Sequence, residues 1–148
     1  SATRFAPAEV WENRNPWLVN RVELIKDSGG AGQYRGGLGV NLEFTMLEDS
    51  YATTVCERTQ LAPWGLHGGK EGLANNCYVI EQNEKILEKP KATRVHVKKG
   101  NRVLIQCGGG GGYGNPKNRK PEKVLDDYKQ GYISKEYIKK FHPEVKTN

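Results

Sequence analysis

The segment that most restricts the fold is a run of five glycines, residues 108–112, followed by Tyr113-Gly114-Asn115-Pro116. Glycine loses more backbone entropy on folding than any other residue, so an ordered run needs compensating interactions. Two interpretations are open: an ordered loop that approaches an anion, a substrate or a neighbouring subunit too closely for a Cβ atom, or a flexible hinge. Tyr113 and Pro116 favour the ordered loop, because a linker rarely needs an aromatic anchor or a fixed φ.

Two further glycine-rich segments precede this run. Residues 27–39 contain six glycines and begin with Asp27-Ser28, a pair that favours local turns. Residues 61–72 contain four more glycines and Trp64, which we expect to fill a core or an interface. Loops of this length are usually functional or disordered, and Tyr34 and Arg35 argue against simple disorder.

Most of the chain before the run has the two-residue period of half-buried strands. Strands are predicted over residues 18–25, 40–46 and 51–56, and hairpins over residues 40–56, 76–87 and 94–105. These patterns predict a mainly β fold: a small sandwich or barrel-like β domain of about six or seven short strands with glycine-rich loops and two short C-terminal helices.

The residues after Pro116 have helical signals. Pro121 suits the first position of a helix, and Gly131 suits its left-handed C-cap. Ser134 is a good N-cap for a second helix, which Pro143 would end. Helices shorter than about 12–15 residues are marginal alone in water, so both must dock on the β part or on a partner.

The length of 148 residues fits a single domain, residues 1–148. Within it we expect an extended arm over residues 1–16, a β region over 17–107, a glycine loop over 108–116 and a helical tail over 117–148. No apolar run approaches the ~20 residues that span a bilayer, and the N-terminus does not resemble a signal peptide. The expected compartment is therefore the cytoplasm.

Charge is divided unevenly along the chain. Residues 1–84 contain 7 basic and 11 acidic residues, whereas residues 85–148 contain 16 basic and 6 acidic residues. A basic half could meet nucleic acid, an acidic protein surface or a phosphorylated ligand. No nucleic-acid-binding motif accompanies the lysines, so a solvated basic face is favoured, and a nucleic-acid-binding module stays in reserve.

The residues that could support independent chemistry are scattered. Cys56, Cys77 and Cys107 are odd in number and form no CxxC pair, which indicates free, buried thiols and no thiolate metal site. His67 and the other histidines stand far apart in the sequence, so no catalytic triad is visible. Asp27-Ser28 could be a catalytic pair, but before two glycines it is more often a turn device.

The glycine segments and the tail together carry a family resemblance. The segments over residues 27–39, 63–69 and 108–116, followed by two helices, resemble the C-terminal part of the hydantoinase B/5-oxoprolinase family. The resemblance runs in the family's order from about Trp17 to Phe141. Motifs in a fixed order over most of a chain are far more specific than a single glycine pattern.

The resemblance implies a multi-subunit complex. Family members act with a hydantoinase A-type partner that holds the ATP site, and they hydrolyse cyclic amides or carboxylate ketones. This sequence lacks the long region that precedes the resembling part in the family, so it is either a fragment or a separate small subunit. The small subunit of an acetophenone carboxylase-like complex is the comparison we favour.

We therefore expect a structural or bridging subunit of an ATP-dependent ketone carboxylase that is not catalytic alone. The alternative is a subunit or fragment of a hydantoinase/5-oxoprolinase-type cyclic amidase that contributes glycine loops to the active site. Expected partners are a hydantoinase A-like ATPase subunit, which would hold ATP and Mg, and a larger hydantoinase B-like subunit; no cofactor, nucleic acid or membrane is expected for this chain. The interface or substrate-proximal residues are expected to be Asp27, Ser28, Gly29, Gly30, Arg35, Gly36, Gly37, Trp64, Gly65, His67, Gly108, Gly109, Gly110, Gly111, Gly112, Tyr113 and Gly114.

Overall fold

The structure, a computed structural model, describes residues 6–146, which form two compact units. Unit 1 contains the chain up to Val22 together with Asn41–Cys56 and Asn76–Ile105. Unit 2 contains Glu23–Val40, Glu57–Asn75 and the chain from Gln106 onward. The chain thus passes repeatedly from one unit to the other, and the expectation of a single domain stays a prediction.

Strands make up most of the regular structure, as the alternating patterns predicted. They are β1 (Trp17–Leu24), β2 (Val40–Met46), β3 (Ser50–Val55), β4 (Asn76–Ile80), β5 (Ile86–Glu88), β6 (Lys91–Val97) and β7 (Arg102–Cys107). The helices are α1 (Ala8–Arg14), the 3-10 helix η1 (Pro116–Asn118), α2 (Pro121–Lys129) and α3 (Lys135–Phe141). A mainly β fold with two short C-terminal helices is confirmed. None of the helices described could cross a membrane, given their length and polarity.

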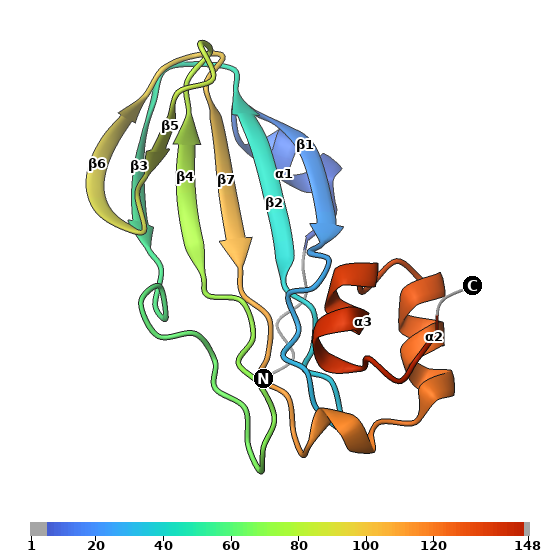
Figure 1. The fold of residues 1–148 in the computed structure, drawn as a ribbon. Helices are drawn as coiled ribbons and strands as arrows, with labels where there is room; N and C mark the ends of the chain where they lie inside the picture. Colours follow the sequence, from blue (N-terminus) through green and yellow to red (C-terminus); the bar gives the residue numbers. More distant parts are fainter. Residues whose placement is uncertain (1–5, 147–148) are drawn as a thin grey trace. The chain divides into compact units, whose positions relative to one another are not determined.

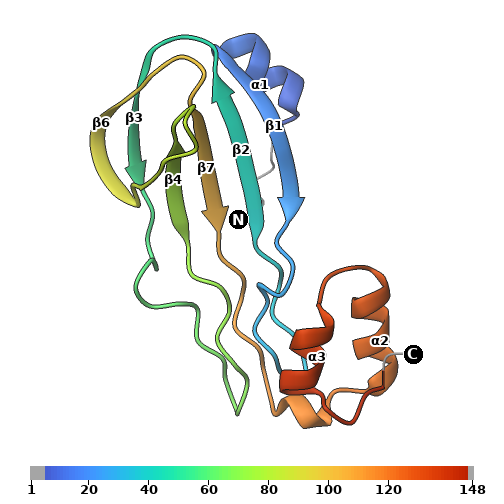
Figure 2. The same cartoon turned by 45° about the horizontal axis from the view of Figure 1, so that its top comes forward.

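The strands form two sheets, as Figures 1 and 2 show. The larger sheet has five strands in the order β1-β2-β7-β4-β5, and the smaller sheet pairs β3 with β6. The β3–β6 pair is antiparallel, with Ser50 opposite Val97 and Val55 opposite Lys91. Neither sheet closes on itself, so the barrel-like alternative does not apply.

Both sheets contribute side chains to the core of unit 1. In β2, Leu42, Phe44 and Met46 alternate with polar residues, and all three are buried. Trp17 of β1 stacks on Phe44, with ring centroids 4.7 Å apart. Burial of each large apolar side chain stabilises the fold by about 1.5–3 kcal/mol. The two-residue period of β2 therefore decides which face of the larger sheet packs into the core of unit 1.

Two of the three predicted hairpins are wrong. β4 and β5 do form the predicted hairpin, but β2 and β3 belong to different sheets, as do β6 and β7. The end of β2 bonds instead to the connection between β6 and β7: Met46 N–H donates to Asn101 O at 2.9 Å, and Gly100 N–H donates to Met46 O at 2.8 Å. An alternating pattern predicts a strand but does not select its neighbour, because packing context decides the pairing.

Residues 8–14 form helix α1, which corrects the expectation of an extended arm over residues 1–16. Residues 1–5 of that arm lie outside the described residues. Trp11 packs against the core of unit 1. A seven-residue helix is too short to be stable alone, so this packing supports it. One tryptophan forms no helical period, and the sequence pattern therefore did not reveal the helix.

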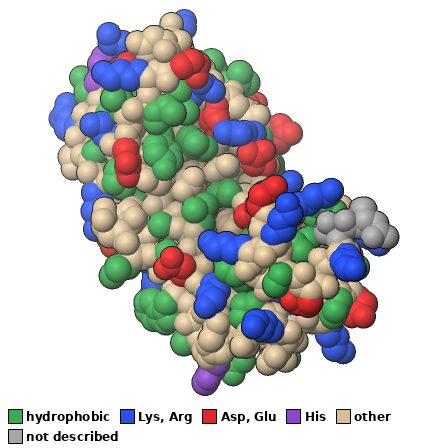
Figure 3. Space-filling view, in the orientation of Figure 1, with side chains coloured by type: hydrophobic (Ala, Val, Ile, Leu, Met, Phe, Trp, Pro, Cys, Tyr) green, Lys and Arg blue, Asp and Glu red, His purple; other side chains and the backbone are tan. Residues whose placement is uncertain are grey.

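The opposite face of the larger sheet carries alternating charges. Glu43 lies on this face because it alternates with the buried Leu42 and Phe44. Its carboxylate pairs with Arg21 at 2.8 Å and with Arg102 at 3.0 Å. Figure 3 shows hydrophobic side chains gathered over the middle strands of this sheet, bordered by basic and acidic side chains.

The helical tail in unit 2 begins and ends where the sequence predicted. Gly131 has φ +78°, and Tyr132 N–H donates to Asp127 O at 2.9 Å, which together form a Schellman C-cap. Ser134 Oγ accepts a hydrogen bond from Tyr137 N–H at 3.0 Å and caps α3. The local capping residues therefore determine the helix boundaries.

The two helices dock within unit 2. Val124 of α2, Ile138 of α3 and Ile133 between them are buried in one apolar cluster. Ala31, from the first glycine-rich segment, belongs to the same cluster. The helices thus pack on a glycine-rich segment, which satisfies the requirement that they dock.

Candidate interaction site

Three glycine-rich segments lie side by side in unit 2, and we call them the glycine bundle. They are residues 27–39, 63–72 and 107–116. Gly110 N–H donates to Gly37 O at 2.9 Å, and Gly112 N–H donates to Lys70 O at 2.8 Å. The 107–116 segment is therefore bonded to both of the others. The predicted site residues of the three glycine-rich segments therefore lie together in one bundle, although the segments are far apart in the sequence.

The N–H groups of the glycine run donate to acceptors within the chain. Gly109 N–H donates to Leu73 O at 3.1 Å, and Gly108 N–H donates to Asn75 Oδ1 at 2.6 Å. With the bonds of Gly110 and Gly112, four of the five N–H groups in the run have protein acceptors. The run is an ordered segment in this structure, and these four N–H groups are not available to an anion.

Close backbone packing explains why glycine is needed in the bundle. A Cβ on Gly36 would lie 1.9 Å from Gly110 O, and one on Gly109 would lie 1.9 Å from Ser28 O. Neighbouring atoms would have to move to admit either side chain. None of the glycines at 108–112 has a positive φ. Packing between segments, not backbone conformation, therefore requires glycine here.

The tight contacts recur every three residues along two of the segments. A Cβ on Gly69 would lie 2.1 Å from Gly112 O, and one on Gly72 would lie 2.3 Å from Gly109 O. Three residues per turn is the period of the polyproline II helix, which has no internal hydrogen bonds. The segments of the bundle likewise bond laterally to one another.

Gly37 and Gly110 are exceptions to this packing. Nothing lies within 4 Å of a Cβ built on Gly37. The nearest atom to a Cβ on Gly110 is Gly37 N at 3.2 Å. The glycines of the bundle are therefore not equivalent, and the structure distinguishes positions that must be glycine from positions that tolerate alanine.

Asp27 and Ser28 hold the first segment in place. Asp27 has φ +62°, and its Oδ1 accepts a hydrogen bond from Ser134 N–H at 2.7 Å. The buried Ser28 Oγ donates to Ile25 O at 2.5 Å and accepts from Gly39 N–H at 2.8 Å. Both side chains are engaged with the backbone, so the pair is a turn device rather than a catalytic pair.

Arg35 ties the bundle to the helical tail. Its Nε lies 3.0 Å from Asp127 Oδ2 on α2, and Arg119 Nη2 lies 2.7 Å from the same oxygen. Arg35 Nη1 also donates to Gly36 O at 2.8 Å. Asp127 is 7% exposed. One buried carboxylate therefore holds two guanidinium groups, and removing it would leave both without their partner.

Two aromatic side chains of the tail are also buried in unit 2. The Tyr137 hydroxyl donates to Gly29 O at 2.9 Å, and burial raises the pKa of Tyr137 to about 12, so it remains a neutral donor. His142 is 1% exposed, and its Nδ1 has no hydrogen-bond partner among the described residues. Burial lowers the pKa of His142, and nearby Arg119 lowers it further, whereas Glu144 and Asp127 act against the shift.

The lowered pKa of His142 predicts a loss of stability in mild acid. The unfolded chain binds a proton near pH 6.5 while the folded chain does not, so the free energy of unfolding falls as pH drops below about 6.5. The slope should be at most about 1.4 kcal/mol per pH unit. Urea unfolding from pH 7.5 to 5.5 measures this, with His142→Gln as the comparison. An equally steep loss in the variant would contradict the assignment.

An exposed group of side chains lies at the bundle, and we call it the cap: Tyr34, Leu66, His67 and Tyr113. The Tyr113 ring lies 6.2 Å from the Tyr34 ring and 5.0 Å from the His67 ring, measured between centroids. Tyr34 is 63% exposed and Tyr113 is 48% exposed. The cap combines residues from all three glycine segments, although they are far apart in the sequence.

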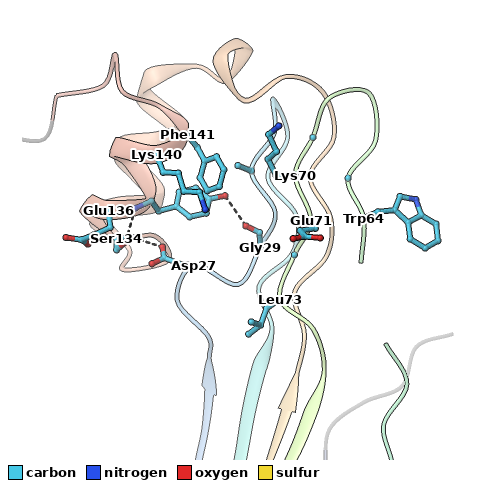
Figure 4. A pocket seen from close by; sticks show the side chains of 15 residues that line it. Asp27, Gly29, Trp64, Lys70, Glu71, Leu73, Ser134, Glu136, Lys140 and Phe141 are labelled. Atoms are coloured by element: carbon cyan, nitrogen blue, oxygen red, sulfur yellow. Dashed lines mark hydrogen bonds between the residues drawn. The ribbon is translucent and has the colours of Figure 1, made fainter. Parts of the chain in front are cut away.

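Unit 2 also contains a cleft of about 860 Å³. Figure 4 shows Lys140 and Phe141 projecting from α3 on one side, with Lys70, Glu71 and Leu73 on the other. Trp64 is 63% exposed at this cleft, and the Arg58 guanidinium lies 4.9 Å from its ring centroid. Trp64 therefore does not fill a core, which leaves an interface as the remaining expectation.

Potential metal ligands and thiols are the remaining candidates for independent chemistry. No group of three or more His, Cys, Asp and Glu residues within residues 6–146 is placed to hold a metal. None of the three cysteines is in a disulfide, but only Cys77 is buried; Cys56 is half-buried and Cys107 is exposed, which corrects the expectation of three buried thiols. Burial raises the pKa of Cys77 to about 11, which disfavours its thiolate.

Sequence reasoning missed several residues that organise the site. Arg119, Asp127, Tyr137 and His142 were not among the predicted site residues, yet Asp127, Tyr137 and His142 are buried in unit 2 and the Arg119 side chain is only 10% exposed. Their spacing in the sequence carries no signal of these contacts, because partners such as Arg35 and Asp127 are 92 residues apart.

Comparison with known proteins identifies related sequences. The family model for hydantoinase B/oxoprolinase matches residues 1–116. An uncharacterized protein of Methanocaldococcus jannaschii is 40% identical over 128 residues, which are 86% of this chain and 23% of that protein. A putative D-/L-hydantoinase B subunit of a Pseudomonas species is 37% identical over 136 residues, 90% of this chain and 23% of its own length. This chain spans about a quarter of the length of these relatives.

Solved structures share the fold. The crystal structure of ATP-dependent caprolactamase from Pseudomonas jessenii matches 96% of this chain and 25% of its own chain, with a TM-score of 0.86 and 28% identity. A nucleotide-free acetone carboxylase structure matches 92% of this chain and 22% of its own chain, with a TM-score of 0.78 and 20% identity. At that identity, the second match supports the fold alone.

Proposed function

This chain belongs to the hydantoinase B/oxoprolinase family, and we propose that it is a structural or bridging component of a multi-subunit, ATP-dependent enzyme complex. The glycine bundle carries this proposal. Its backbone groups bond to one another, and Asp27, Ser28 and Arg35 bond to the backbone or to Asp127 rather than converging on an open site. Such a bundle suits a rigid support for a partner better than a catalytic centre.

Two substrate classes are compatible with this role. Carboxylation of a ketone by an acetophenone carboxylase-like complex is the first, and the fold shared with acetone carboxylase is compatible with it. Hydrolysis of a cyclic amide is the second, and the similarity to a hydantoinase component and to a caprolactamase supports it. In either case we place the glycine bundle at an interface or beside the substrate.

We assign ATP and Mg to a hydantoinase A-like partner subunit. The glycine run does not fit a phosphate-binding loop, since its N–H groups donate to protein acceptors such as Leu73 O and Lys70 O. In addition, Gly69-Lys70 is followed by Glu71 rather than by the Ser or Thr of a phosphate-binding loop. The proposed partners are this ATPase subunit and a larger hydantoinase B-like subunit.

We predict that the isolated chain neither binds Mg-ATP with micromolar affinity nor hydrolyses it. Calorimetric titration of the purified chain measures binding, and micromolar affinity would contradict the proposal. The chain should then be mixed with the hydantoinase A-like and larger hydantoinase B-like subunits. We expect substrate-dependent ATP hydrolysis only when all three are present. Acetone or acetophenone with bicarbonate, compared with hydantoin, 5-oxoproline or caprolactam, distinguishes the substrate classes.

A further inference from the structure

We propose that the cap is a docking surface for the part of a hydantoinase B-type polypeptide that lies outside this chain. This inference rests on the proposed function, because it assigns one surface of unit 2 to one of the proposed partners. The partner should offer an apolar site with hydrogen-bond acceptors for two tyrosine hydroxyls.

The side chains of the cap have the chemistry of an interface. Tyr34, Leu66 and Tyr113 are 63%, 52% and 48% exposed. Within residues 6–146, neither tyrosine hydroxyl has a hydrogen-bond partner. Tyrosine combines a large apolar ring with one polar group, and it is enriched at protein interfaces for this reason. Exposed apolar groups that are clustered, rather than single, usually mark an interaction site.

The backbone beneath the cap is fixed by hydrogen bonds within the chain. Tyr34 N–H donates to Tyr113 O at 3.0 Å, and Tyr113 N–H donates to Tyr34 O at 2.9 Å. Leu66 N–H donates to Gly112 O, and Leu66 O accepts from Gly114 N–H, both at 2.9 Å. The three glycine segments therefore hold the cap in one arrangement, so docking requires little further ordering of the backbone.

His67 gives an independent indication that the cap has a function. Its φ is +51°, and the next residue, Gly68, has φ +92°. Non-glycine residues seldom adopt the left-handed region, and such positions cluster at binding and active sites. Here the strained turn places an exposed imidazole 5.0 Å from the Tyr113 ring. A glycine at this position would relieve the strain but would remove one member of the cap.

The length of the relatives identifies the partner. The same fold occupies 25% of the caprolactamase chain with a TM-score of 0.86, and the matching segment is 23% of the Pseudomonas hydantoinase component. In those proteins, about three quarters of the polypeptide is covalently joined to the part that matches this fold. In such a polypeptide, a surface of this fold that docks on the other three quarters would be covered, whereas the described residues leave the cap exposed.

The test measures binding of the 148-residue chain to the larger hydantoinase B-like polypeptide by surface plasmon resonance. We expect Tyr113→Ala and Tyr34→Arg each to raise the Kd at least about tenfold. The matched control is Tyr51→Ala in unit 1, because Tyr51 is 65% exposed and its ring lies 5.3 Å from that of His96. The control should change the Kd less than about twofold. His67→Gly should raise both the Kd and the melting temperature of the isolated chain.

Four other results of the binding test would contradict the inference that the cap docks on the larger hydantoinase B-like polypeptide. Unchanged affinity in folded cap variants would show that the cap is not the docking surface, while the proposed role in a complex would stand. Loss of binding only to the ATPase subunit would assign the cap to that partner instead. A dimer of the isolated chain that Tyr34→Arg dissociates would show that the cap binds a second copy. If the parent chain binds neither subunit, the proposed function fails as well.

Discussion

Gly36→Ala should reduce the free energy of unfolding by about 3 kcal/mol, because the new Cβ would lie 1.9 Å from Gly110 O. The oxygen belongs to the backbone of a neighbouring segment, which is itself bonded to Gly30 N–H at 2.9 Å, so it cannot move without breaking the bundle. For a chain of this size the melting temperature should fall by about 6–12 °C. Urea or thermal unfolding followed by circular dichroism measures the change.

The adjacent Gly37→Ala is the matched control for this prediction. Nothing lies within 4 Å of a Cβ at Gly37, and its φ is not positive. The substitution should be neutral, or stabilising by about 0.4–1 kcal/mol through a less flexible unfolded chain. If the two variants had the same stability, close packing would not be the reason for glycine in the bundle. Gly110→Ala, with its nearest contact at 3.2 Å, should fall between them.

Asp127→Asn should destabilise the chain by about 3–5 kcal/mol. The carboxylate is 7% exposed and lies 3.0 Å from Arg35 Nε and 2.7 Å from Arg119 Nη2. The amide retains the size of the side chain but not its charge, so two largely buried guanidinium groups would lose their counterion. Urea unfolding followed by circular dichroism measures this loss, which should appear as a lower urea concentration at the midpoint of unfolding.

Asp126→Asn provides the control for Asp127→Asn, since Asp126 is the preceding residue on α2 and is exposed. Exposed substitutions of this kind usually change stability by less than about 0.5 kcal/mol. A double-mutant cycle between Asp127→Asn and Arg35→Gln would isolate the coupling between the bundle and the tail. Additive effects would show that the Arg35–Asp127 pair does not join them.

The contrast between Gly36 and Gly37 also bears on how the bundle could serve a partner. Positions that must be glycine for packing belong to the support, and their substitution should reduce stability and assembly together. Cap positions such as Tyr34 have exposed side chains, so their substitution should reduce assembly while the fold persists. The two groups of variants therefore separate a structural role of the bundle from a docking role of the cap.

Local features of the sequence determined most of the elements, with helix α1 as the exception. The alternation of Leu42, Phe44 and Met46 was enough to predict a strand and its buried face, because side chains in a strand alternate between two sides. Gly131 and Ser134 were enough to place the helix boundaries, because capping depends on residues within one turn of the helix end. The order of the glycine segments and the helical tail also carried the family resemblance, and the family model that matches residues 1–116 confirmed membership of the hydantoinase B/oxoprolinase family.

Only the tertiary structure decided which segments meet. The sequence could not assign β2 and β3 to different sheets, because the same alternation suits any neighbouring strand. Nor could it show that Gly110 O occupies the place of a side chain at Gly36, or that Arg35 reaches Asp127, 92 residues away. A glycine carries no pattern that names its neighbour, and a charged side chain can pair with many partners. Contacts of this kind depend on the position of distant backbone, which only the folded chain supplies.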